Sequence, residues 1–189
     1  PKFYQEMFGE EGVSDSGLEV NYRFPGTLNF SLLAGLASGR TFGHSHTEGE
    51  KPDLPTNYLR LGYFFEAFDW NGFDVGLNYL NRINGTGDQT LFFGLDFVGK
   101  KKEGATLKHL IQSEFWSRTS SFDAGGDDRH ELGCYVYYQY GFTKDWALGA
   151  RLDYFTDLSR KDFFGNSLEY YDLRGILSLT YQPSEFLRF

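Results

Sequence analysis

Arginines and carboxylates recur at alternate positions along the chain, and they are the side chains whose type and spacing best suit chemistry. A row of them along one surface would set a local electric field and so an ion preference. Opposite charges on neighbouring segments would also pair, contributing about 0.2–1 kcal/mol per pair. We expect them to line one wall of a water-filled space. The predicted members of this wall are Glu19, Arg23, Arg60, Glu66, Asp74, Asp96, Glu114, Arg118, Arg151, Asp153, Asp172 and Arg174.

Two histidines in a polar stretch have the composition of a metal site. His44 and His46 are one residue apart, and Glu48, Glu50 and Asp53 follow. Imidazole and carboxylate ligands suit zinc. A solvated polar loop explains the same residues and is the commoner role for such a stretch, so zinc binding here is a hypothesis beside that simpler interpretation. The sequence predicts no cofactor.

Two adjacent carboxylates, Glu10 and Glu11, lie in the region 1–16, for which we expect a loop or an inward-folded segment. Inside a bore, these side chains would form a constriction that favours cations. At the mouth of the bore, they would be exposed to solvent. The sequence leaves both placements open.

Several function classes lack the residues that they need. The serines have no Gly-x-Ser-x-Gly nucleophile motif, and the histidines have no recognisable acid partner, so we predict no enzyme activity. The net charge is −8 and no basic stripe is present, which argues against nucleic acid as a partner. Cys134 is the only cysteine, which excludes an internal disulfide and a cysteine-based zinc site.

Apolar residues alternate with polar ones, and this period of two identifies the elements that carry the charges. Successive side chains of a strand point to opposite faces, whereas a helical spacing would scatter these residues around the axis. The chain is therefore predicted to be all-β, with one apolar and one mostly polar face on each strand. Nine strands are predicted, at 17–25, 27–38, 58–67, 73–80, 90–97, 107–118, 131–142, 146–154 and 171–181.

The connections between these strands alternate in length. The first, third and seventh are tight, the fifth is fairly short, and the even-numbered ones are longer. In an antiparallel up-and-down sheet, odd and even connections lie at opposite ends. One end is therefore expected to carry tight turns and the other extended loops.

Two solvents could face the apolar sides of these strands. In a soluble sandwich or ligand-binding barrel the apolar sides would pack inward, on strands of about 5–6 residues. In an outer-membrane barrel they would face lipid, on strands of about 9–11 residues. The long strands, the charges of both signs on the polar sides and the aromatic residues near strand ends favour a transmembrane β-barrel over 17–189. The truncated tenth strand from Glu185 and the abrupt start at Pro1 predict that it is part of a larger barrel.

Residues 137–154 (YYQYGFTKDWALGARLDY) resemble the strand, tight periplasmic turn and strand of bacterial outer-membrane β-barrels of the porin type. Residues 8–14 (FGEEGVS) and 181–186 (YQPSEF) are similar to a narrower group of porin-like barrels labelled zinc-regulated outer-membrane proteins. The resemblance implies a bacterial outer-membrane location, contact with lipid and lipopolysaccharide, and passive passage of small hydrophilic solutes or ions. The alternative is a plugged or partner-filled barrel acting as a receptor or scaffold. A homo-oligomer or an envelope protein partner fits either alternative.

Overall fold

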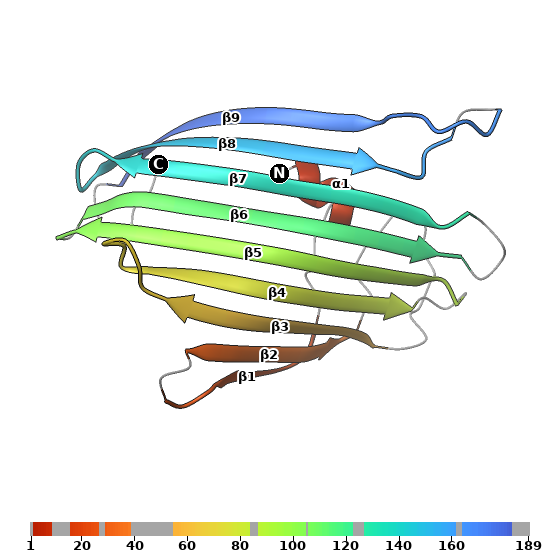
Figure 1. Cartoon of the computed structure of the whole chain (residues 1–189), viewed down its shortest axis with the longest axis horizontal. Coiled ribbons are helices and arrows are strands. Elements are labelled where there is room, and N and C mark those ends of the chain that lie inside the picture. The colour runs from red at the N-terminus through yellow and green to blue at the C-terminus, as the bar shows by residue number, and fades with distance from the viewer. Residues whose placement is uncertain are drawn as a thin grey trace.

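The computed structural model describes residues 2–8, 16–26, 29–38, 55–83, 87–104, 106–122, 127–161 and 164–182. These residues form one antiparallel sheet whose strands follow one another in chain order (Figure 1). In sequence the elements are α1 (Lys2–Phe8), β1 (Gly17–Arg23), β2 (Phe30–Ala37), β3 (Thr56–Phe65), β4 (Gly72–Ile83), β5 (Gln89–Glu103), β6 (Thr106–Ser121), β7 (Arg129–Gly141), β8 (Trp146–Asp157) and β9 (Tyr171–Tyr181).

The nine predicted strands and their up-and-down order are confirmed. Short connections join β1 to β2, β3 to β4, β5 to β6 and β7 to β8 at one end of the sheet, which we call the tight-turn end and which lies on the left in Figure 1. At the opposite end the connections from β2 to β3, β6 to β7 and β8 to β9 are longer, but the one from β4 to β5, 84–88, is as short as the tight turns because both strands extend beyond their predicted ends. This division follows from the alternating loop lengths in the sequence, because each strand reverses the chain direction.

The hairpin between β5 and β6 corrects one prediction. The sequence places Lys100, Lys101 and Lys102 in a connection after residue 97, but these residues continue β5 and pair with β6. Backbone pairing needs no apolar side chain, so the ladder runs on after the alternation of apolar and polar residues has ended.

The sheet is open. In the described residues β1 and β9 form its two edges, so these nine strands do not close into a barrel. The predicted tenth strand, beginning at Glu185, lies outside the described residues. No helix among the described residues has the length and hydropathy needed to cross a membrane.

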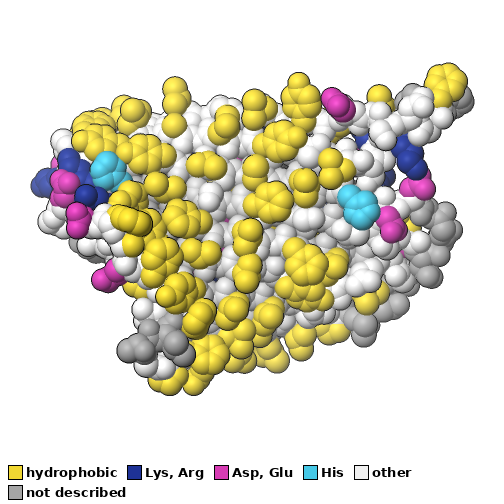
Figure 2. Space-filling view, viewed as in Figure 1, with side chains coloured by type: hydrophobic (Ala, Val, Ile, Leu, Met, Phe, Trp, Pro, Cys, Tyr) yellow, Lys and Arg dark blue, Asp and Glu magenta, His cyan; other side chains and the backbone are white. Residues whose placement is uncertain are grey.

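The two faces of the sheet differ in chemistry, and the apolar one is exposed. Leu77 is 56 %, Phe93 54 % and Leu148 52 % exposed. On the other face, the side chains of Asp96 and Arg151 are each 18 % exposed. Figure 2 looks onto the apolar face, where hydrophobic side chains spread over the middle and charged side chains gather at the two ends. The predicted separation of apolar and charged residues onto opposite faces is confirmed.

The buried core lies on the polar face, beneath α1. Phe3, Met7 and Phe8 of the helix are almost fully buried against Phe92 and Phe155 of the sheet. In Figure 1 the helix lies behind the strands, on the side away from the apolar face. A small helix therefore covers part of the surface that carries the charges.

Candidate functional site on the polar face

The strands bring most of the predicted wall residues onto one surface. Glu66 follows the end of β3 and is exposed, whereas the others all lie within strands. The register joins them across the sheet: Asp96 pairs with Glu114, and Asp153 pairs with Arg174. Arg23, the last residue of β1, is exposed. The polar face therefore carries a charged surface whose members at the ends of β1 and β3 are exposed.

Arg60 joins three strands through two carboxylates. Its Nε donates to Asp96 Oδ2 at 2.9 Å, and its Nη2 donates to Asp96 Oδ1 at 2.7 Å and to Asp74. Asn78 adds a hydrogen bond from Nδ2 to Asp96 Oδ2 at 2.6 Å. A single guanidinium thus faces two carboxylates, so this group carries a net charge of −1.

Glycines make room for this arrangement. A Cβ atom added to Gly62 would lie 2.6 Å from Arg60 Nη1, and one added to Gly76 would lie 2.6 Å from Arg60 Nε. Both glycines face the same side as Arg60 in the register. The guanidinium can therefore lie flat against the sheet, which keeps the space above it open.

Glu114 is held by neutral donors instead of a cation. Tyr4 and Tyr135 donate their hydroxyls, the latter to Oε1 at 2.8 Å, and Trp116 Nε1 donates to Oε2 at 2.9 Å. The guanidinium of Arg151 stacks on the Tyr135 ring at 3.7 Å and bonds to Asp153. Burial, and then the hydrogen bond to Glu114, raise the pKa of Tyr4 far above its usual range, so Tyr4 stays a neutral donor.

Arg118 fastens the C-terminal end of α1 to the sheet. Its Nη1 donates to the carbonyl oxygens of Glu6 at 2.9 Å and Met7 at 2.6 Å, and its Nε donates to Glu131. The last carbonyls of a helix have no partner within the helix and carry partial negative charge, so a cation stabilises them. Phe8 adds a stacked contact with Phe92, with ring centroids 5.1 Å apart.

A groove of about 610 Å³ is lined by residues of β1 to β4 and by Trp116 of β6. Glu19, Tyr58, Arg60, Asn78 and Trp116 line it. The Tyr58 hydroxyl donates to Glu19 Oε2 at 2.8 Å, and the Tyr58 and Trp116 rings lie against glycines of the neighbouring strands. The groove combines these hydrogen-bonding and charged groups with apolar side chains, among them Leu33 and Leu80.

Four predicted site residues lie outside the described residues: Glu10, Glu11, His44 and His46. The constriction and the zinc hypothesis that rest on them stay predictions. Among the residues that the structure describes, no group of three or more His, Cys, Asp or Glu side chains could hold a metal ion.

The sequence analysis missed α1 and the side chains that meet it. Met7 follows Phe3 by four residues and Tyr4 by three, and Phe8 follows Tyr4 by four, a helical spacing that could have identified the helix. The alternation of residues places Trp116, Tyr135 and Glu131 on the polar face. Only the fold shows that Trp116 and Tyr135 bind Glu114, that Trp116 contacts Phe8 of α1, and that Glu131 binds Arg118. The contacts with α1 join residues far apart in sequence: Tyr4 and Glu114 are separated by 110 positions.

Comparison with family models, with curated proteins and with solved structures gave no match in any of the three. The resemblance to porin-like and zinc-regulated outer-membrane proteins therefore stays a prediction. What the structure does show is a nine-stranded antiparallel open sheet that has an exposed apolar face and a charged face partly covered by a helix.

Proposed function

We propose that this chain forms part of the wall of a bacterial outer-membrane β-barrel, through which small hydrophilic solutes or ions pass passively. In this proposal the apolar face contacts lipid and the polar face lines the water-filled lumen. The free edges of β1 and β9 pair with further strands, because hydrocarbon leaves no water to satisfy an open edge.

The exposed apolar face is the observation that carries the proposal. Leucines on the central strands are about half exposed, and Leu18 and Leu177 near the two edges are 80 % and 82 % exposed. A soluble protein rarely exposes so continuous an apolar surface, because leaving it in water forfeits the free energy of burial. A bilayer removes that cost. The charges at both ends of the apolar band fit the two headgroup regions (Figure 2).

Strand length and aromatic placement support the same proposal. The six strands from β4 to β9 have between 11 and 16 residues. A tilted strand needs about 9–11 residues to cross the hydrocarbon. At the tight-turn end Phe73 stacks on Phe65, Trp70 and Phe97, and Trp146 stacks on Tyr181. Rows of aromatic rings are typical of the boundary between lipid and water.

Conductance across a planar lipid bilayer tests the proposal. The full-length protein is expected to give steady open-channel currents, and extraction from membranes is expected to need detergent. Recovery of a folded protein in detergent-free buffer would contradict the membrane location. A detergent-requiring protein that never conducts would contradict passive passage while leaving the barrel intact.

A plugged or partner-filled barrel is the second candidate, and α1 is the observation that favours it. The helix buries Phe3, Met7 and Phe8 on the polar face and is tied to Arg118. In a narrow lumen such a helix would obstruct flow. Absence of current from the intact protein, with current restored when residues 2–8 are removed, would support this alternative. A homo-oligomer or an envelope protein partner remains compatible with both candidates.

A further inference from the structure

A β-bulge in the hairpin of β5 and β6 turns two consecutive side chains to the apolar face. Lys101 pairs with His109, but Lys102 pairs with Leu107, which leaves Lys108 as the extra residue. Lys108 Nζ lies 5.3 Å from the centroid of the Tyr140 ring, and the His109 ring lies 5.4 Å from the same ring. Tyr140 belongs to the apolar face, so Lys108 and His109 both reach that face. Bulges commonly redirect a side chain in this way.

The neighbouring turn adds an aromatic ring to this position. Asn71 Oδ1 accepts a hydrogen bond from the backbone N–H of Lys102, and the backbone N–H of Asn71 donates to the carbonyl of Lys100 at 2.9 Å. This docks the turn between β3 and β4 onto the hairpin. Trp70 then lies 5.9 Å from the His109 ring, measured between centroids. The lysines are thus held beside aromatic rings at the margin of the apolar band.

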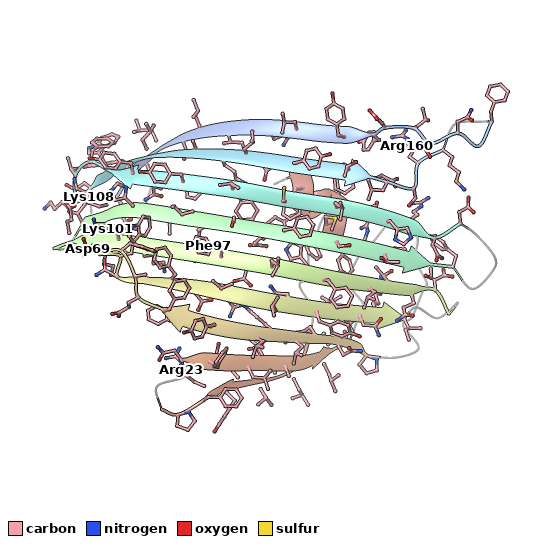
Figure 3. All side chains as sticks on the ribbon, viewed as in Figure 1. Arg23, Asp69, Phe97, Lys101, Lys108 and Arg160 are labelled. Atoms are coloured by element: carbon pink, nitrogen blue, oxygen red, sulfur yellow. The ribbon has the colours of Figure 1, made fainter. Side chains whose placement is uncertain are left out.

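The two hairpin lysines on this surface have no acidic partner among the described residues. Neither Lys101 nor Lys108 forms an ion pair with any carboxylate of the described residues, although Glu103 and Asp69 lie at the same end. Figure 3 labels both lysines together at the tight-turn end, with Arg160 at the opposite end. There, by contrast, Lys161 pairs with Asp127 at 2.5 Å. The hairpin therefore places two ammonium groups next to the apolar face, neither of them paired with a carboxylate in the part of the chain that the structure describes.

We infer that Lys101 and Lys108, with Trp70, His109 and Tyr140, bind the phosphate headgroup of an anionic glycerophospholipid. The inference rests on the proposed function, because it needs the apolar face to lie in a bilayer. Ammonium groups attract an anionic headgroup, and the rings fit the headgroup level. Short turns of outer-membrane barrels face the periplasm, where the leaflet consists of phospholipid. Glycerophospholipid is therefore the assigned source of the phosphate, in preference to lipopolysaccharide.

Quenching of Trp70 fluorescence by brominated lipid tests this inference. The protein is reconstituted in nanodiscs as Trp146→Phe and as Trp146→Phe with Trp70→Phe, and the difference between the two signals isolates Trp70. Brominated phosphatidylglycerol is compared with brominated phosphatidylcholine at equal fractions. Half-quenching is expected at about thirty-fold less phosphatidylglycerol, as two lysines at roughly 1 kcal/mol each near the surface would give. The preference is expected to fall as salt is raised.

The control removes the same charge at the other end of the sheet. Lys101→Gln with Lys108→Gln is expected to abolish the preference without abolishing quenching, whereas Arg160→Gln with Lys161→Gln should leave the preference unchanged. Equal quenching of the wild-type background by both lipids would overturn the inference alone. Absence of quenching by either lipid would overturn the proposed membrane location as well. Stronger competition by unlabelled lipopolysaccharide than by unlabelled phosphatidylglycerol would overturn the assignment to phospholipid.

Discussion

Charged side chains on the polar face are fixed in position by hydrogen bonds that do not cancel their net charge. Arg60 lies flat over glycines and faces two aspartates, while Glu114 is bound by phenol and indole donors. Neither arrangement projects a long flexible side chain away from the sheet. A lumen lined in this way would keep its width and a fixed electrostatic pattern, on which ion preference depends.

Replacing Arg60 by methionine leaves Asp74 and Asp96 without their shared cation. We expect reversal potentials in a salt gradient to show a greater preference for cations. We also expect the free energy of unfolding in detergent to fall by about 1–2 kcal/mol, a moderate value because the Arg60 and Asp96 side chains are 28 % and 18 % exposed. Lys144→Met, which removes an exposed cation from the turn between β7 and β8 and not from the charged wall, is the control and should change neither quantity appreciably. Unchanged selectivity in Arg60→Met would contradict a role of this group in the lumen.

Tyr4 is expected to resist ionisation. Because its folded pKa is raised, the stabilising contact with Glu114 is fully present below the pKa of an unfolded tyrosine, about 10. The contribution of this contact to the free energy of unfolding declines as the pH rises above about 10, because the unfolded chain then releases the tyrosine proton while the folded chain keeps it. Tyrosinate absorbance, compared between the wild type and Tyr4→Phe, measures this. A tyrosine that titrates near pH 10 in the wild type and is missing from the variant would show that Tyr4 is not buried against Glu114.

At the level of elements, α1 and the sheet depend on one another. Seven residues are too few for a helix to persist alone in water, so packing against the sheet must stabilise it. Phe8 touches Phe92 and Trp116, and Arg118 binds the last carbonyls. The helix therefore narrows any lumen only while these contacts hold.

Replacing Arg118 by methionine should release α1. The variant loses two hydrogen bonds to helix carbonyls and leaves Glu131 without its cation, at a cost of about 2–3 kcal/mol. We expect a larger single-channel conductance and faster proteolysis within residues 2–8. Arg129→Met, at an exposed position on β7, should leave both at wild-type values. An unaltered cleavage rate in Arg118→Met would mean that the apolar contacts alone hold the helix.

The strands could be predicted because a period of two, as along Leu59, Leu61 and Tyr63, occurs in only one regular secondary structure, the β-strand. The same alternation predicted which face carries Arg60 and Asp96. The helix does not follow a period of two; its helical spacing of apolar residues covers only seven positions, and its stability comes from tertiary contacts. The partners of Glu114 could not be predicted, because Tyr4 is 110 residues away in sequence. The end of β5 was missed because Lys100 to Lys102 interrupt the alternation, although backbone pairing continues.

For the whole molecule, the difference between the two faces predicts that an added charge destabilises the protein on the apolar face and not on the polar face. Leu77, at the centre of β4 on the apolar face, pairs with Leu61 and Leu95. Leu77→Arg should cost about 2–4 kcal/mol in a bilayer and lower the yield of folded protein in refolding into lipid vesicles. Gln112→Arg, on the polar face, introduces the same charge and should refold nearly as well as the wild type. Equal yields from the two variants would contradict the proposed orientation.

Collision accessibility of spin labels along β5 examines most directly whether the apolar face lies in hydrocarbon. In a Cys134→Ser background, single cysteines replace each residue from Leu91 to Val98 and carry the label in lipid vesicles. We predict that oxygen accessibility is highest at Leu91, Phe93, Leu95 and Phe97. Accessibility to a water-soluble nickel chelate should be highest at Asp96 and Val98, because Phe92 is buried beneath α1 and Gly94 is covered by the Trp116 ring. High chelate accessibility at Phe93 and Leu95, equal to that at Asp96, would show that water covers the apolar face.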